Sequence, residues 1–141
     1  MNWFRWALLS GFFAGLTAVL AKIGVAGVDS TLATAIRTGV VLIFTWALFF
    51  TIQPGGNIFA LTSRNWLFLV LSGLATGLSW VCYFRALQLG EASRVAPIDK
   101  LSVLFAILFA VVFLKERLTW QHWIGGGLVL IGSIVLGLQS K

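Results

Sequence analysis

The chain has 141 residues, of which 60% are hydrophobic and 10% charged, with a formal net charge of +6 and a mean hydropathy of +1.00. A soluble core of this size cannot bury so much apolar surface, so the composition predicts an integral membrane protein. Spans of about 20 residues cross a hydrocarbon core of about 30 Å, which leaves room for five crossings, and the scattered basic residues argue against nucleic-acid binding.

The first predicted span covers residues 4–26. The aromatic and basic segment at 3–6 is typical of a membrane interface, and an uncharged run, 7–21, follows it. Further apolar segments come after this run, whereas a secretory signal would lead into a soluble chain. Four residues share one helical face: Gly11, Gly15, Ala18 and Lys22. This face either packs closely against another helix or lines a transport path.

The second span is predicted over residues 32–52, after a short turn at 27–30, and the third over residues 65–89. Arg37 lies about one and a half turns inside the second span. Turn-forming residues predict the longest loop at 54–64. Polar residues line one face of the third span: Ser72, Thr76, Ser79 and Tyr83. This stripe either forms a cavity wall or makes hydrogen bonds to a neighbouring helix.

The fourth span is predicted over residues 95–114, after a turn with charge on both sides. Gly90 suits the left-handed position that follows a helix, and Ser93 suits the N-cap of the next one. Pro97 then falls in or near the first turn, where its missing N–H costs little.

The last span is predicted over residues 120–138, with Thr119 as its cap. His122 is interpreted as an interfacial polar residue instead of a ligand, because no other histidine or carboxylate cluster accompanies it. Residues at helical spacing form a second stripe with small members: Gly126, Leu130, Ser133 and Gly137. This stripe predicts tight packing against a partner helix.

Two stretches also resemble a known family. ALQLGEASRVAPIDKLSVLFAILFAVVFLKERLT resembles the last repeat segment of EamA-type proteins in the drug/metabolite transporter superfamily, and AKIGVAGVDSTLATAIRT is similar to the first loop and second-helix entry of that family. Many members resemble two such units in tandem, whereas this chain holds one. The resemblance implies a single EamA-like membrane domain over residues 1–141: an all-α integral membrane fold of five transmembrane helices, forming one repeat of an inverted-repeat (5+5) transporter.

The basic residues that flank the predicted spans nearly balance. With five crossings, four lie on the N-terminal side (Arg5, Arg64, Lys115, Arg117) and three on the other (Arg85, Arg94, Lys141), when Lys22, Arg37 and Lys100 are left out as lying deeper in spans. The positive-inside rule therefore selects neither orientation, and the count permits dual topology. A lone unit with an odd number of helices can recreate an inverted repeat by pairing with an inverted copy of itself.

Four basic residues, Lys22, Arg37, Arg85 and Lys100, are predicted to lie about four or five residues inside spans, at ends on the same side, or roughly 6–8 Å deep. They either extend to lipid phosphates and nearby acids or form an electropositive vestibule. Asp99 and Lys100 are expected on different helical faces, and the dipole of the fourth helix adds positive charge there. The predicted substrate-binding residues are Lys22, Arg37, Ser79, Tyr83, Arg85, Asp99 and Lys100.

These features predict a membrane transporter for a small metabolite, an exporter that works by alternating access as an antiparallel homodimer in the bacterial inner membrane. The substrate is expected to be anionic or zwitterionic. The alternative is a non-transporting membrane subunit that packs on a partner protein. The sequence contains no set of nucleophile, histidine and carboxylate that would predict an enzyme, and it implies no cofactor. A single cysteine, Cys82, supplies neither a disulfide nor a thiolate metal site.

Overall fold

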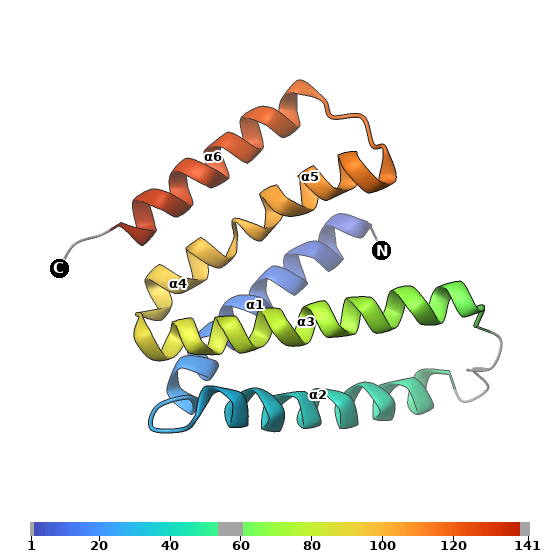
Figure 1. The fold of residues 1–141 in the computed structure, drawn as a ribbon, viewed down its shortest axis with the longest axis vertical. Helices are drawn as coiled ribbons and strands as arrows, with labels where there is room; N and C mark the ends of the chain where they lie inside the picture. The colour runs from blue at the N-terminus through green and yellow to red at the C-terminus, as the bar shows by residue number, and fades with distance from the viewer. Residues whose placement is uncertain (1, 54–60, 139–141) are drawn as a thin grey trace. The chain divides into compact units, whose positions relative to one another are not determined.

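The computed structural model describes residues 2–53 and 61–138. Those residues form helices with the following bounds (Figure 1): α1 Trp3–Gly24, α2 Ser30–Ile52, α3 Ser63–Leu89, α4 Ala92–Asp99, α5 Ser102–Leu114 and α6 Trp120–Gly137. Five stretches in the described part of the chain are long and apolar enough to cross a membrane, with α4 and α5 together making one of them. The all-α membrane fold predicted from the sequence is therefore confirmed. Most of the predicted 54–64 loop, and Lys141, lie outside the described residues.

Helix α2 begins two residues earlier than predicted, and its cap explains why. The Asp29 carboxylate accepts the backbone N–H of Thr31 at 2.9 Å and that of Leu32 at 3.0 Å, so helical geometry is supported from Ser30 onward. Within α2, threonine hydroxyls donate to carbonyls one turn back, as Thr34 does to Ser30. Such bonds satisfy hydroxyl groups inside an apolar medium.

The fourth span differs most from the prediction, because it contains a break. Helix α4 starts at Ala92, so Ser93 is not its cap, and Pro97 is the sixth residue instead of a first-turn residue. The left-handed glycine among the described residues is Gly27, with φ 73°, and not Gly90. Pro97 supplies no N–H to the helical ladder.

Beyond Pro97 the backbone hydrogen bonds join residues three apart in the sequence instead of four. The N–H of Lys100 donates to the Pro97 carbonyl at 3.1 Å, and that of Leu101 donates to the Ile98 carbonyl at 3.0 Å. Such bonds tighten the chain relative to an α-helix. Helix α4 therefore ends at Asp99, and α5 begins at Ser102.

The chain divides into two compact units, residues 1–23 with 89–141, and residues 24–88. In the first unit, α6 packs against α4 and α5 (Figure 1). A Cβ added at Gly126 would lie 3.1 Å from Leu104 Cδ2, so α6 approaches α5 closely there. The Arg94 guanidinium also donates from Nε and Nη2 to the Gly137 carbonyl, at 3.3 and 3.1 Å. The stripe predicted on the last span thus packs as expected at its two ends.

Most large apolar side chains of the described residues are exposed, and the buried hydrophobic set is small: Ala18, Val25, Phe84 and Leu87. An outward apolar surface of this kind suits lipid and not water. The stripe on α1 is buried at Ala18, but a Cβ at Gly11 or Gly15 would meet no described heavy atom within 4 Å. The close packing expected from the first span is therefore not made by these glycines within the chain.

The contact between α4 and α6 gives a first prediction. A Cβ at Gly137 would lie 2.6 Å from Cδ1 and 2.8 Å from Cγ1 of Ile98. The exposed Ile98 side chain must shift to admit this Cβ, so Gly137→Ala should lower the melting temperature in detergent, with a cost in stability below the about 1–3 kcal/mol that overpacking costs in a core. Gly132→Ala is the matched control on the same helix, since a Cβ there meets nothing within 4 Å in the described structure. Equal melting temperatures for the two variants would contradict close packing at Gly137.

Candidate functional site

The guanidinium of Arg37 is held between α2 and α3 by aromatic rings. Its Cζ lies 4.3 Å from the ring centroid of Trp80 and 5.4 Å from that of Phe84. The two rings are four residues apart on α3 and so share one face. Tyr83 lies close enough to interact electrostatically with Arg37. Arg37 is seven residues after Ser30, or about 10 Å along the helix.

The charge of Arg37 has no acidic partner on the two helices that surround it. A basic residue at the centre of a span is about 2.5–3.5 kcal/mol uphill on insertion scales. A cation–π contact returns about 0.5–2 kcal/mol, depending on desolvation. The chain has four acidic residues (Asp29, Glu91, Asp99, Glu116), and none lies in the α2 or α3 sequence. The rings stabilise the charge without cancelling it.

A second group of polar residues ties the end of α3 to the turn before α2. The Gln88 side-chain amide donates to the Val28 carbonyl at 2.5 Å and its oxygen accepts from Arg85 Nη1 at 3.0 Å. Arg85 also acts electrostatically on Asp29. Arg85 is therefore engaged with the α1–α2 turn, whose position it helps to fix.

The pKa of the Asp29 carboxyl is lowered from its ordinary value. The main cause is the backbone N–H of Leu32, followed by a smaller opposing effect of desolvation, then by Thr31 and the positive charge of Arg85. The charged carboxylate is thus the form that the folded turn favours.

At the break in the fourth span, Lys100 Nζ lies 3.7 Å from Asp99 Oδ2. These neighbours were expected to point in different directions, whereas their side chains meet. Lys100 is eight residues after Ala92, or about 12 Å along the span, so it lies deeper than the predicted four or five residues. It also follows the C-terminal end of α4, where the helix dipole favours a cation, although it precedes the N-terminus of α5.

Lys22 and Ser79 are two further residues that the sequence predicts to bind substrate. Lys22 Nζ donates to the Gly90 carbonyl at 2.7 Å, which ties the end of α1 to the residue after α3. Ser79 is exposed on α3, one turn from Tyr83. On the same stripe, the Thr76 hydroxyl donates to the Ser72 carbonyl at 2.9 Å, so this hydroxyl is satisfied within its own helix.

The predicted substrate residues are divided between the two units. Arg37, Ser79, Tyr83 and Arg85 belong to residues 24–88, and Lys22, Asp99 and Lys100 to the other unit. Their convergence at one mouth stays a prediction. Sequence reasoning missed Trp80 and Gln88. The available signal for Trp80 was its place nine residues before the end of α3, away from the interfacial position usual for tryptophan.

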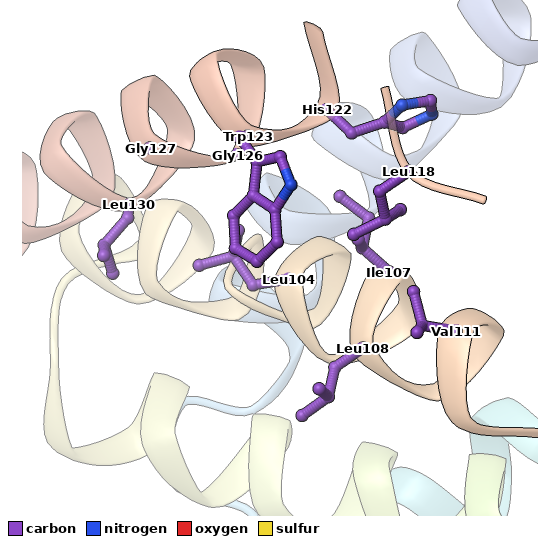
Figure 2. Close-up of a pocket in the computed structure, with 10 residues that line it drawn as sticks. All are labelled: Leu104, Ile107, Leu108, Val111, Leu118, His122, Trp123, Gly126, Gly127 and Leu130. Carbon is purple, nitrogen blue, oxygen red and sulfur yellow. The ribbon is translucent and has the colours of Figure 1, made fainter. Parts of the chain in front are cut away.

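The first unit also contains an apolar cavity of about 370 Å³ (Figure 2). Its lining comes from α5, α6 and the segment between them: Leu104, Ile107, Leu108, Val111, Leu118, His122, Trp123, Gly126, Gly127 and Leu130. His122 Nδ1 accepts the Thr119 backbone N–H at 3.1 Å, completing a capping box at the start of α6. The predicted Thr119 cap is thus present, and the apolar walls suit a hydrocarbon group better than a charged metabolite.

The profile of the EamA-like transporter family matches residues 1–138. The chain belongs to this family. An uncharacterized transporter in the cobO 3'region of Sinorhizobium sp is 48% identical to this EamA protein over 137 residues, 97% of each chain. A probable 4-amino-4-deoxy-L-arabinose-phosphoundecaprenol flippase subunit ArnE of Hamiltonella defensa is 32% identical over 72 residues, 51% of this chain and 63% of the relative. No solved structure matches significantly.

Membership supports the coarser predictions made from the sequence. The EamA protein is a multi-pass membrane transporter, which implies a small-molecule substrate and a lipid environment. EamA is a transporter family and not a class of enzymes. The resemblance identified in the loop and repeat segments is confirmed.

The Asp29 cap gives a second prediction. Asp29→Ala should lower the melting temperature of the EamA protein, because it removes the acceptor for two backbone N–H groups, while Asp29→Asn keeps an oxygen acceptor. With the folded pKa lowered, the charge stabilises the folded state above the unfolded pKa of about 3.9, and this contribution is lost as the pH falls through the folded pKa. The melting-temperature gap between wild type and Asp29→Asn should therefore narrow from about pH 6 to about pH 3. A gap independent of pH would contradict a stabilising carboxylate.

Proposed function

We propose that this EamA protein exports a small anionic or zwitterionic metabolite by alternating access, as an antiparallel homodimer in the bacterial inner membrane. The observation that carries the proposal is the break between α4 and α5, which places Asp99 and Lys100 inside a membrane span. Transporters built from repeats bind substrates and ions near the middle of the bilayer, typically at discontinuous helices. The whole chain is proposed to act as one membrane domain.

The pair at the break is suited to exchanging its partners. The side chains of Lys100 and Asp99 are 55% and 38% exposed, and their 3.7 Å separation is long for a strong ion pair. Exposed pairs of this kind contribute about 0–1 kcal/mol, so separating them costs little. An anionic group of a solute that passes along the path would take the place of Asp99 beside Lys100 for a time, and a solute amine would interact with Asp99. The other charged residues predicted along the path, Lys22, Arg37 and Arg85, are all basic, so the path as a whole favours a zwitterion or an anion over a cation.

The remaining predicted residues are proposed to contribute polar groups along the same path: Lys22, Arg37, Ser79, Tyr83 and Arg85. Arg37 and Tyr83 lie near one another, whereas Lys22 and Arg85 already bind neighbouring groups through hydrogen bonds. Lys22 and Arg85 would therefore shape the path through the segments that they fix.

An inverted pair of chains is supported by the flanking charges and by α1. Four basic residues against three give neither orientation an advantage. The small residues Gly11 and Gly15 leave a face of α1 on which the described residues place no atom within 4 Å of an added Cβ. Helices associate through such faces in membranes, so a second copy is a suitable partner.

The third prediction tests Lys100 by flux. Purified protein alone in liposomes should move the substrate found in a metabolite screen, and Lys100→Ala should abolish this flux with insertion and assembly unchanged. Lys100→Arg should restore it only partly, since a planar fork differs from a point charge. Lys115→Gln is the control, because Lys115 is exposed at the other end of α5.

Two outcomes would contradict this proposal. Wild-type flux through Lys100→Ala would leave Lys100 as a lipid anchor. No flux by the purified wild-type protein, restored by a co-reconstituted partner, would instead favour the non-transporting subunit. Measuring flux from preloaded and from empty vesicles gives its direction.

The fourth prediction concerns orientation. Reporters fused after the C-terminus should appear on both sides of the membrane in comparable amounts, because the flanking charges nearly balance. Added lysines next to Arg64 should bias the distribution toward one side. A reporter found on one side only in the wild type would exclude dual topology and favour a parallel dimer or a separate partner half.

A further inference from the structure

The contacts of Arg37 leave the edges of its guanidinium available. The ring centroids of Trp80 and Phe84 lie 4.3 and 5.4 Å from Cζ, the central carbon of the planar group. A guanidinium that stacks on an aromatic ring keeps its N–H groups in its own plane, directed away from the ring. Arg37 is half-buried, so part of its side chain is accessible, and no buried side-chain nitrogen in the described residues lacks a hydrogen-bond partner.

Charge and burial distinguish Arg37 from the other arginine held near an aromatic ring. Arg64 lies 5.8 Å from the Phe68 ring at the start of α3, where it is exposed and suited to anchoring at the interface. Arg37 is half-buried within a span and has one contact with a buried ring, that of Phe84. No acidic residue lies in the sequence of α2 or α3. Arg37 therefore needs a compensating anion more than Arg64 does.

We infer that Arg37 binds the carboxylate of the transported solute edge-on and that Trp80 is the positioning residue that fixes its guanidinium. The inference rests on the proposed transport function and adds a residue and a chemical group to it. The shared chemistry is an oxyanion that offers two oxygens side by side, which the fork of an arginine donates to with two N–H groups. Trp80 limits rotation of the fork, which lowers the ordering cost of binding.

The ring of Trp80 also bears on the solute. Trp80 is half-buried, so part of its ring is accessible, and Arg37 lies 4.3 Å from the ring centroid. A solute with a carboxylate on a short apolar or aromatic body would pack on the exposed part of this ring while its oxygens meet Arg37. Small monocarboxylates are therefore the class of ligand that the geometry favours.

The test uses the full-length protein in maltoside detergent, stripped of lipid. Acetate and benzoate are the probes, and acetamide and benzamide are their uncharged controls, at constant ionic strength. We expect at least one carboxylate to raise the melting temperature, with no effect of the amides. Arg37→Gln should remove this shift, and Arg37→Lys should weaken binding by about tenfold through loss of the fork.

Trp80 is tested by a conservative and a non-conservative variant. Trp80→Leu should also weaken carboxylate binding by about tenfold, whereas Trp80→Phe keeps an aromatic face and should restore most of it. Arg64→Gln and Trp66→Leu are the matched controls, and both should keep the wild-type shift. Rescue by phenylalanine separates positioning of Arg37 from a general loss of folding.

Three results would overturn the inference. The first is a carboxylate-induced shift that is undiminished in Arg37→Gln, and the second is no shift with any carboxylate in the wild type. The last is a shift that depends on Arg37 and is produced by added phosphatidylglycerol but by no carboxylate. The last would make Arg37 a binder of lipid phosphate. Flux in liposomes distinguishes failure of the proposed transport function from failure of the proposed Arg37 site. Binding through Arg37 without flux would contradict the transport function but keep the site. Flux that is unchanged in Arg37→Gln would contradict the site but keep the transport function.

Discussion

The constraint on which the rest of the structure depends is the cost of unpaired polar groups in hydrocarbon. Water is absent from the bilayer core, so each backbone group and each charge must find its partner in the protein or in a ligand. Threonine hydroxyls of α2 meet this demand within their own helix, as Thr38 does by donating to Thr34 at 2.8 Å. Arg94 meets it by donating to the Gly137 carbonyl. The polar groups that such local solutions leave weakly compensated are those that we propose for transport.

The positive charges of Arg37 and Lys100 are compensated in different ways. Arg37 lies against aromatic rings, which attract the cation but leave its charge in place. Lys100 lies beside the carboxylate of Asp99, but in a pair exposed enough to separate easily. Neither solution uses a buried, hydrogen-bonded ion pair, which would hold the charge permanently and resist exchange. Weak compensation of this kind is what a carrier needs, because its substrate must bind and then leave.

The five spans could be predicted because hydropathy and length alone decide them, and the Thr119 cap follows from residue type, whereas the Asp29 cap was not predicted. The break after α4 could not be predicted from the sequence, because the effect of Pro97 depends on where the helix begins. Helix α4 begins at Ala92 without a side-chain cap, so no residue type marks its start. The stacking of Trp80 on Arg37 was also beyond the sequence. It depends on how α2 and α3 are rotated about their axes, and residue spacing within one helix carries no information about its neighbour.

Lipid can cover the exposed apolar side chains of this chain, because acyl chains are as apolar as leucine, so those side chains alone require no protein partner. Two other features are not satisfied by acyl chains. The open face at Gly11 and Gly15 gains its close packing only from another helix backbone. The N–H donors of Arg37 gain no hydrogen bonds from acyl chains, and an oxyanion would give them strong, charge-assisted ones. The chain therefore leaves one surface suited to a second copy and one cation suited to a solute, which agrees with the proposal of a carrier assembled from two inverted copies.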